Sequence, residues 1–355
     1  MKKSSVLIAL SGGVDSAVCA LLLKEQGLDV HAIYLNLTNT DFSCRSAEAA
    51  GNIAGHLNIP FNVLDVKERF HREVVGYFLQ NYSTGLTPNP CIICNAKVKF
   101  QCVMEEALKR DIFCIATGHY ARVVNRQEQI LLFKGLDRAK DQSYFLAMLP
   151  GSILCHLLLP LGSMSKSQVR DMAKRAGIHD IILPESQEIC FLKGDYREFL
   201  LSAMPDLNSP GDIVDVKGNV LGRHSGLYGY TVGQRRGIGI PAKAPLYVVG
   251  LDVASNRLIV GSNDDLFFTR FIVDSLNWLD RDIDVNEGIF NVKIRFRHAG
   301  QEATVKNISD DKLLIEFKEP QRAITPGQFA VVYSGEQVIV GGRICRLPSI
   351  HWAVR

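Results

Sequence analysis

The chain has 355 residues, a formal net charge of +3, 47% hydrophobic residues and 22% charged residues. A length well above the roughly 150 residues of a typical domain predicts two or three domains, and the composition excludes a disordered chain. The apolar run Val6–Leu10 is shorter than the roughly 7 to 15 residues of a signal-peptide core, and no stretch approaches the length of a membrane span. We therefore expect a cytoplasmic protein without a membrane partner.

The first 200 or so residues alternate short apolar runs with helical patterns, which predicts a doubly wound α/β domain with a parallel sheet. Strands are expected at Val6–Leu10, Val30–Leu37, Phe61–Val66 and Ile112–Thr117. Helices are expected from about Ser16 to Gly27, over Arg45–Leu57, over Asn95–Arg110, and from the capping box at Ser165 to about Ala176.

Beyond about Pro205 the helical periodicity ends and glycine, proline and β-branched residues dominate. Leu246–Val253 and Leu258–Gly261 predict a hairpin with a short turn. Later short strands have the spacing of a small barrel or sandwich: Val292–Arg297, Leu313–Phe317, Phe329–Tyr333 and Gln337–Val340. We expect three domains, over residues 1–205, 206–268 and 269–355.

The string Ser11-Gly12-Gly13-Val14-Asp15-Ser16 lies between the first strand and the first helix. Adjacent glycines let the backbone approach phosphate oxygens, serine hydroxyls can donate to them, and the positive helix end attracts anions. Asp15 can hold a Mg²⁺ that bridges those oxygens. The missing Gly-Lys-Ser/Thr ending excludes a Walker-type loop. The motif predicts a pyrophosphate site rather than a turn without a ligand.

This motif resembles that of the ATP-pyrophosphatase (PP-loop) superfamily, whose members activate a carbonyl or amide oxygen by transfer of AMP. The resemblance implies the adenine nucleotide alpha hydrolase-like fold, with ATP as cofactor. It implies ATP contacts from Ala9, Leu10, Ser11, Gly12, Gly13, Val14, Asp15, Ser16, Leu35 and Gly118. The motif does not define the acceptor, because the superfamily includes GMP synthetase, argininosuccinate synthetase, tRNA lysidine synthetase and tRNA thiolases.

Two cysteine motifs narrow the choice: Thr87-Pro88-Asn89-Pro90-Cys91-Ile92-Ile93-Cys94-Asn95 and Ser186-Gln187-Glu188-Ile189-Cys190-Phe191. They resemble those of the bacterial tRNA-specific 2-thiouridylase family. Further strings agree with that family: Thr117–Tyr120, Lys140–Tyr144, Tyr230–Gly237 and Pro326–Gln328. The resemblance covers nearly the full length, and it implies a small central domain and a C-terminal β-barrel after the catalytic domain.

The nine cysteines are an odd number in a chain without an export signal, which argues against a disulfide framework. Sulfur delivery needs one thiol that carries a persulfide and a second that resolves it. The resemblance assigns the persulfide to Cys190 and the nucleophile to Cys94, with a transient disulfide between them. Many family members have an aspartate where this chain has Cys91. Cys91, Cys94 and Cys190 could therefore hold an iron–sulfur cluster instead, an alternative that the sequence leaves open.

The resemblance also implies a tRNA partner. A locally basic segment supports it, since between positions 217 and 257 only Asp252 opposes the basic residues Lys217, Arg223, Arg235, Arg236, Lys243 and Arg257. The expected tRNA contacts are Asn89, Pro90, Cys91, His119, Lys140, Asp141, Gln142, Arg235, Arg236, Arg295, Phe296 and Gln328. For the polar groups among them, a charged turn or an outward-facing strand is the alternative.

The predicted activity is adenylation of the 2-oxygen of a wobble uridine, followed by sulfur transfer from a cysteine persulfide and release of AMP and pyrophosphate. A cysteine desulfurase or a sulfur-relay protein would reload the persulfide. The rival interpretations are another PP-loop synthetase or thiolase, including an iron–sulfur enzyme, and a non-catalytic RNA-binding protein that keeps a nucleotide fold.

Overall fold

The computed structural model describes residues 4–127, 129–183, 189–192 and 194–345. The chain divides into two compact units, the first formed by residues 1–75, 91–191 and 336–338 and the second by residues 76–90, 192–335 and 339–355. Within the described residues, no helix is both long and apolar enough for a membrane span. The division into domains at 205 and 268 stays a prediction.

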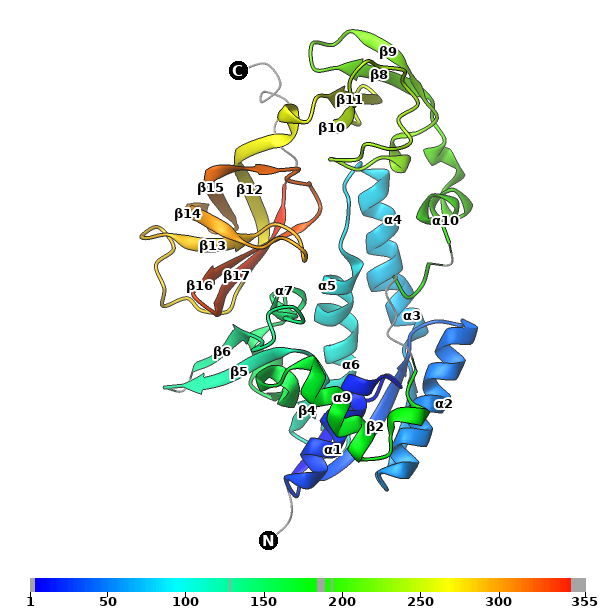
Figure 1. Cartoon of the computed structure of the whole chain (residues 1–355), viewed down its shortest axis with the longest axis vertical. Helices are drawn as coiled ribbons and strands as arrows, with labels where there is room; N and C mark the ends of the chain where they lie inside the picture. The colour runs from blue at the N-terminus through cyan, green and yellow to red at the C-terminus, as the bar shows by residue number, and fades with distance from the viewer. Residues whose placement is uncertain (1–3, 128, 184–188, 193, 346–355) are drawn as a thin grey trace. The chain divides into compact units, whose positions relative to one another are not determined.

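The first unit contains a five-stranded sheet in the order β3-β2-β1-β4-β7, with every neighbouring pair parallel (Figure 1). The strands are β1 (Ser5–Ala9), β2 (Asp29–Asn36), β3 (Phe61–Asp65), β4 (Cys114–Ala116) and β7 (Leu157–Leu158). The predicted parallel sheet is confirmed. Chain order reverses between β1 and β4, and open sheets bind ligands at such a reversal, beyond the carboxyl ends of the strands.

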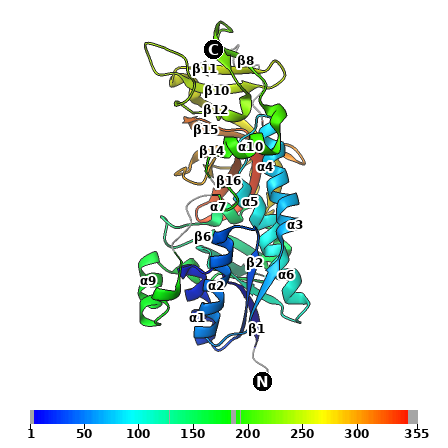
Figure 2. The same cartoon turned by 90° about the vertical axis from the view of Figure 1, so that its right-hand side faces the viewer.

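Helices cover both faces of this sheet. Val6 and Ile8 of β1 are fully buried against α1 (Val14–Glu25), α2 (Asp41–His56) and α9 (Lys166–Arg175). Side chains alternate between the faces of a strand, so Leu7 is buried on the other face, where α6 (Phe100–Leu108) contacts β1 and β4. Figure 2 shows α9 and α6 on opposite sides of the strands. The predicted capping box at Ser165 is confirmed.

The segment from 90 to 108 differs from the single helix expected over Asn95–Arg110. It consists of α5 (Pro90–Cys94), a π-helical turn, η2 (Asn95–Lys99), and then α6. A π turn carries one more residue than an α turn and occurs most often at functional sites. A hydrophobic period of 3.6 residues cannot show this insertion, which rotates the side chains on either side of Cys94 relative to one another.

The first unit holds several other short elements. An antiparallel hairpin, which the sequence pattern did not predict, is formed by β5 (Ala121–Arg126) and β6 (Gln129–Lys134). The helical elements are α3 (Lys67–Phe70), η1 (His71–Val75), α7 (Ser143–Leu146), α8 (Gly151–Leu154), η3 (Pro160–Ser163) and η4 (His179–Ile181).

The second unit begins with helices α4 (Gly76–Ser83) and α10 (Tyr196–Ala203) and a four-stranded sheet in the order β10-β11-β8-β9. Its strands are β8 (Gly211–Asp215), β9 (Val220–His224), β10 (Tyr247–Asp252) and β11 (Arg257–Gly261). The predicted hairpin is confirmed, because β10 and β11 pair antiparallel. The 3-10 turns of this unit are η5 (Pro205–Leu207), η6 (Leu227–Gly229) and η7 (Asp264–Leu266).

A closed six-stranded barrel completes the second unit. Its strands follow the order β12-β15-β14-β13-β16-β17, and β12 pairs with β17 to close it. They are β12 (Phe267–Trp278), β13 (Phe290–Lys293), β14 (Gln301–Ser309), β15 (Lys312–Arg322), β16 (Phe329–Ser334) and β17 (Gln337–Ile344). The barrel is confirmed, but the strand expected to reach Arg297 ends at Lys293, so Arg295 and Phe296 lie in the segment after it.

The end of β4 approaches the start of α1 so closely that only glycine fits at position 118. A Cβ there would lie 2.7 Å from the carbonyl carbon of Asp15 and 2.7 Å from the amide nitrogen of Ser16. Both are backbone atoms, which cannot rotate away as a flexible side chain can. The structure therefore ties the carboxyl end of β4 to the first turn of α1.

We predict that Gly118→Ala lowers the free energy of unfolding by about 1–3 kcal/mol, because the added methyl group overpacks this contact. Urea denaturation measures the change. The matched control is Gly55→Ala in α2, where a Cβ meets no heavy atom within 4 Å and should stabilise the helix by roughly 0.5–1 kcal/mol. A Gly118→Ala protein as stable as the wild type would show that β4 can move away from α1 at little cost.

Candidate active site

The start of α1 presents backbone N–H groups without a capping side chain. Gly13 is the N-cap and makes no side-chain cap hydrogen bond. The Ser16 hydroxyl accepts from the Ser11 amide at 3.1 Å and donates to the Gly13 carbonyl at 3.1 Å. These two hydrogen bonds stabilise the turn. The turn is thus held in place while no side chain caps the amides at the start of α1, an arrangement that suits a phosphate group.

A cavity of about 440 Å³ lies at the reversal of strand order. The ends of β1, β2 and β4 line it, and nine of the ten predicted ATP residues are among its lining: Ala9, Leu10, Ser11, Gly13, Val14, Asp15, Ser16, Leu35 and Gly118. Gly12 is the exception. Its φ is +80°, and a Cβ there would lie 2.8 Å from the Ser46 carbonyl oxygen, so Gly12 packs the loop onto α2. The cavity volume suits a nucleotide-sized ligand.

Sequence reasoning missed part of this lining. The additional residues that it did not identify include Tyr34, Thr38, Phe42, Ser43, Ser46, Lys99, Phe100, Val103 and Thr117. The Ser46 hydroxyl is buried, and none of the described residues is its hydrogen-bond partner. An unpaired buried hydroxyl facing a cavity is a group that a ligand can satisfy.

The Asp15 carboxylate is partly exposed to the cavity and has two partners inside the protein. The Lys166 ammonium nitrogen lies 2.7 Å from each carboxylate oxygen, and the Tyr120 hydroxyl donates to Oδ1 at 2.7 Å. The Mg²⁺ predicted at Asp15 would have to share this carboxylate with the buried Lys166 ammonium group. We therefore assign no step to a metal at this carboxylate.

The thiols predicted to carry sulfur differ in exposure. Cys94 is buried at the end of α5, whereas Cys91 is exposed, and Cys190 is exposed and lines the cavity that holds the loop. All nine cysteines are free thiols, so the expected Cys94–Cys190 disulfide is not formed here. The Ser186–Glu188 part of the second cysteine motif lies outside the described residues.

The positive charge of Lys99, in the π turn, lowers the pKa of these thiols. Burial raises the pKa of Cys94 to about 12, and the nearby Lys99 ammonium opposes that rise. Although part of each residue is exposed, desolvation by the surrounding protein also raises the pKa of the Cys91 and Cys190 thiols, and Lys99 again acts in the opposite direction. The thiols are therefore protonated at neutral pH in the ligand-free chain, and the Lys99 charge is what favours their anionic form.

The described residues do not form a preformed ligand set for an iron–sulfur cluster. Among the described residues, no three His, Cys, Asp or Glu side chains are arranged to hold a metal ion. Cys91, Cys94 and Cys190 therefore do not fit a cluster as they stand, and we derive no step through one.

His119 lies at the carboxyl end of β4 and lines the same cavity. Its Nδ1 is 2.8 Å from the Thr117 hydroxyl, and its ring packs 5.5 Å from the Phe100 ring, centroid to centroid. Burial, with the Lys99 charge as a smaller cause, lowers the pKa of His119 to about 3. The imidazole is therefore neutral at physiological pH and can offer hydrogen bonds to a base but no positive charge to a phosphate.

The turn predicted to contact tRNA is built around Asp141. This carboxylate is buried and accepts from the Gly135 amide, the Ser143 amide and the Ser143 hydroxyl. The Gln142 side chain accepts from the Tyr120 amide at 2.9 Å. Asp141 and Gln142 thus shape the turn, and contacts of Lys140, Asp141 and Gln142 with tRNA stay a prediction.

Four of the predicted tRNA residues of the second unit, Arg235, Arg236, Arg295 and Gln328, lie in three different settings. Arg235 and Arg236 are exposed. One Arg295 guanidinium nitrogen donates to the Arg322 carbonyl at 3.1 Å. The Gln328 amide nitrogen donates to the carbonyls of Thr87 and Pro88, directly before Asn89 and Pro90. In this conformation Gln328 supports the segment that leads into the first cysteine motif, and its contact with RNA stays a prediction.

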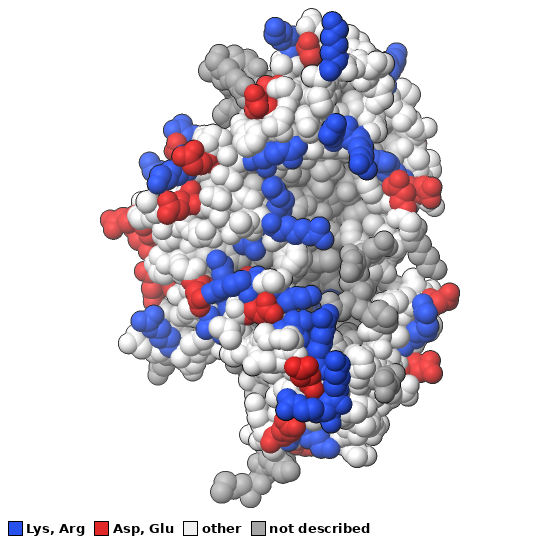
Figure 3. Space-filling view, in the orientation of Figure 1, with Lys and Arg blue, Asp and Glu red and all other residues white. Residues whose placement is uncertain are grey.

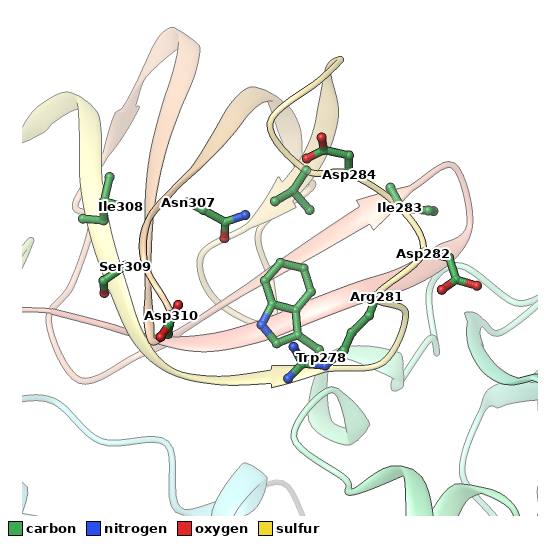
Figure 4. Close-up of a pocket in the computed structure, with 10 residues that line it drawn as sticks. Trp278, Arg281, Asp282, Ile283, Asp284, Asn307, Ile308, Ser309 and Asp310 are labelled. Carbon is green, nitrogen blue, oxygen red and sulfur yellow. The ribbon is translucent and has the colours of Figure 1, made fainter.

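A cavity of about 830 Å³ on the barrel is unsuited to RNA. Figure 4 shows Trp278 and the side chains around it, and the Arg281 guanidinium lies 5.7 Å from the centroid of the Trp278 ring. The charged residues of the lining are Arg281, Asp282, Asp284 and Asp310. Acidic side chains also gather at the left-hand edge of the barrel in Figure 3. Three carboxylates against one cation repel phosphates, so we assign this cavity no part in tRNA binding.

Three protein families match successive parts of the chain. The family described as "tRNA methyl transferase HUP domain" matches residues 4–194. Families described as "tRNA methyl transferase PRC-barrel domain" and "Aminomethyltransferase beta-barrel domain" match residues 197–262 and 268–344.

Named relatives match this chain over nearly the full length of both sequences. The tRNA-specific 2-thiouridylase MnmA of Acidithiobacillus ferrooxidans is 43% identical over 351 residues, which cover 97% of this chain and 99% of the relative. The enzyme of the same name from Carboxydothermus hydrogenoformans is 41% identical over 356 residues, which cover 96% and 98%. A solved U34-tRNA thiolase NcsA of Methanococcus maripaludis, with its iron–sulfur cluster, covers 58% of this chain and 65% of its own at 18% identity and a TM-score of 0.36, from which we infer nothing.

We predict that Lys99→Met slows alkylation of Cys190 by roughly 3- to 10-fold at a pH of about 8, because loss of the positive charge raises the thiol pKa further. Mass spectrometry of iodoacetamide-treated protein gives the rate for each cysteine. The matched variant is Lys97→Met, which removes an exposed lysine of the same turn. Exposed Cys155 should react at one rate in all three proteins, and an unchanged rate at Cys190 would contradict the role of Lys99.

Proposed function

The chain belongs to the tRNA-specific 2-thiouridylase family and is a tRNA-uridine 2-sulfurtransferase, and on that premise we propose that it adenylates the 2-oxygen of a wobble uridine and replaces it with sulfur carried on Cys190. One observation carries the proposal. The cavity that the PP-loop lines at Ser11 and Gly13 is also lined by Cys190. The activating group and the sulfur carrier can therefore act on one bound base.

In the first step the uridine 2-oxygen attacks the α-phosphorus of ATP. An oxygen–phosphorus bond forms, the bond between the α-phosphorus and the bridging oxygen breaks, and pyrophosphate leaves. The uncapped amides at the start of α1 supply hydrogen bonds to the departing pyrophosphate. The ring carbon then carries AMP, which is a far better leaving group than the original oxygen.

In the second step the terminal sulfur of the Cys190 persulfide attacks the activated carbon. A carbon–sulfur bond forms, the carbon–oxygen bond breaks, and AMP departs with that oxygen. The Cys94 thiolate then attacks the Cys190 sulfur, which releases 2-thiouridine and leaves a Cys94–Cys190 disulfide. A cellular thiol must reduce this disulfide before a cysteine desulfurase or a sulfur-relay protein reloads Cys190.

Two neighbours support this chemistry. The Lys99 ammonium favours the thiolate of Cys94, whose pKa burial raises to about 12. The neutral imidazole of His119 lines the cavity and can hydrogen-bond the flipped base. For the tRNA itself, we place contacts on residues of both units, Lys140–Gln142 in the first and Arg235–Arg236 in the second.

A thiolation assay tests the proposal. The protein is incubated with ATP, unmodified tRNA and a labelled persulfide donor, and the nucleosides are analysed by mass spectrometry. We expect 2-thiouridine from the wild type and from Cys155→Ser, which alters an exposed thiol outside the cavity. Cys94→Ser and Cys190→Ser should form none, yet Cys190→Ser should still release pyrophosphate when tRNA is added, because adenylation precedes sulfur transfer.

The same assay separates the alternatives. Absence of 2-thiouridine from the wild type, both with and without oxygen, would overturn the proposal. The second candidate is an iron–sulfur enzyme, which the C-x-x-C string at Cys91 suggests although the thiols do not fit a cluster in this conformation. Iron and acid-labile sulfide that copurify anaerobically, and that track the yield of 2-thiouridine, would replace the persulfide step with a cluster.

A further inference from the structure

An ion pair behind the PP-loop, between the buried Lys166 and the partly exposed Asp15, joins residues that are 151 positions apart in the sequence. The Lys166 ammonium lies 2.7 Å from both Asp15 carboxylate oxygens, and its side chain is 8% exposed. The Tyr120 hydroxyl donates to the same carboxylate, and the Lys166 ammonium lies 5.7 Å from the centroid of the Tyr120 ring. We propose that Lys166 is a positioning residue of the nucleotide site, whose ammonium group, rather than a metal ion, neutralises Asp15 while ATP is bound.

The position of Lys166 in the fold supports this role. It is the first residue of α9, and its backbone N–H donates to the Asp137 carboxylate at 3.0 Å, directly after the Ser165 cap. A positive charge in the first turn of a helix opposes the helix dipole. The pairing with Asp15 offsets that conflict, and it fixes the ammonium to a rigid helix start rather than to a flexible loop.

The charges of the site show why Asp15 needs such a partner. Asp15 lies in the first turn of α1 and lines the cavity, beside the amides that we assign to pyrophosphate. A bare carboxylate there would repel the phosphate oxygens. Lys166 is not among the described residues of the lining, so its ammonium compensates the carboxylate from the side away from the ligand. The inference about Lys166 rests on the proposed function in one respect, namely that the ligand of this site is ATP.

A double-mutant cycle tests this inference without tRNA or a sulfur donor. Isothermal titration measures the affinity for α,β-methylene ATP, with Mg²⁺ present, of the wild type, Asp15→Asn, Lys166→Met and the double variant. We expect Lys166→Met to weaken binding by roughly tenfold or more, because it leaves the carboxylate uncompensated beside the phosphates. The double variant should recover to within roughly threefold of the wild type, since it removes both charges.

Ligation of a metal by Asp15 predicts the opposite pattern. Lys166→Met would then leave the affinity unchanged or improve it, and the double variant would bind as weakly as Asp15→Asn, a result that overturns the inference. Lys174→Met, on the exposed side of α9, is the matched control and should bind like the wild type. Thermal unfolding shows whether Lys166→Met is folded. If it is not, the double variant tests the inference alone: near-wild-type affinity for the nucleotide supports it, and loss of binding refutes it.

The two proposals can fail separately. The titration reports on nucleotide binding alone, so a protein that makes no 2-thiouridine can still show the predicted cycle. Conversely, a protein that thiolates tRNA but shows the titration pattern of a metal bound by Asp15 would support the proposed function and refute the inference about Lys166.

Discussion

The uncapped start of α1 is the constraint on which the rest of the site depends. With Gly13 as its N-cap, α1 forgoes only about a few tenths of a kcal/mol relative to a Ser, Thr or Asp cap. The Ser16 hydroxyl is committed to the turn itself, and the end of β4 packs directly against the backbone of Asp15 and Ser16. The surrounding structure thus holds the turn in place without a side-chain cap on its amides, as an anion site requires.

The sulfur side of the cavity depends on a second departure from regular structure. The π turn of η2 follows Cys94 and ends at Lys99, which lines the cavity together with Cys190. Burial raises the thiol pKa of Cys94 to about 12, and Lys99 opposes that rise. Protonated thiols react slowly with oxidants, so the ligand-free site is protected, while the lysine keeps the anionic form within reach.

The sequence was enough to predict the elements whose signals are local. The strand, loop and helix at residues 6–27 were predicted from a buried apolar run, a glycine pair and a helical pattern, and α9 from its capping box. The barrel strands followed from short alternating runs between turn residues, apart from β12 and β14, which the strand assignments omitted, and β13, which ends at Lys293.

The rest depends on tertiary contacts that a local pattern does not encode. Lys99 enters the site through an inserted π residue, which a 3.6-residue period hides. Gln328 donates to backbone carbonyls some 240 positions away. Lys166 did leave a signal, since a lysine in the first turn of a helix opposes the helix dipole and needs a compensating partner.

The fate of the uridine oxygen tests the central claim most directly. A tRNA that carries oxygen-18 at the 2-position of its wobble uridine is thiolated with unlabelled ATP, and the released AMP is analysed by mass spectrometry. Adenylation of that oxygen predicts one oxygen-18 atom in AMP for each 2-thiouridine formed. Unlabelled AMP alongside 2-thiouridine would contradict it, because the oxygen would then have left without passing through the α-phosphate.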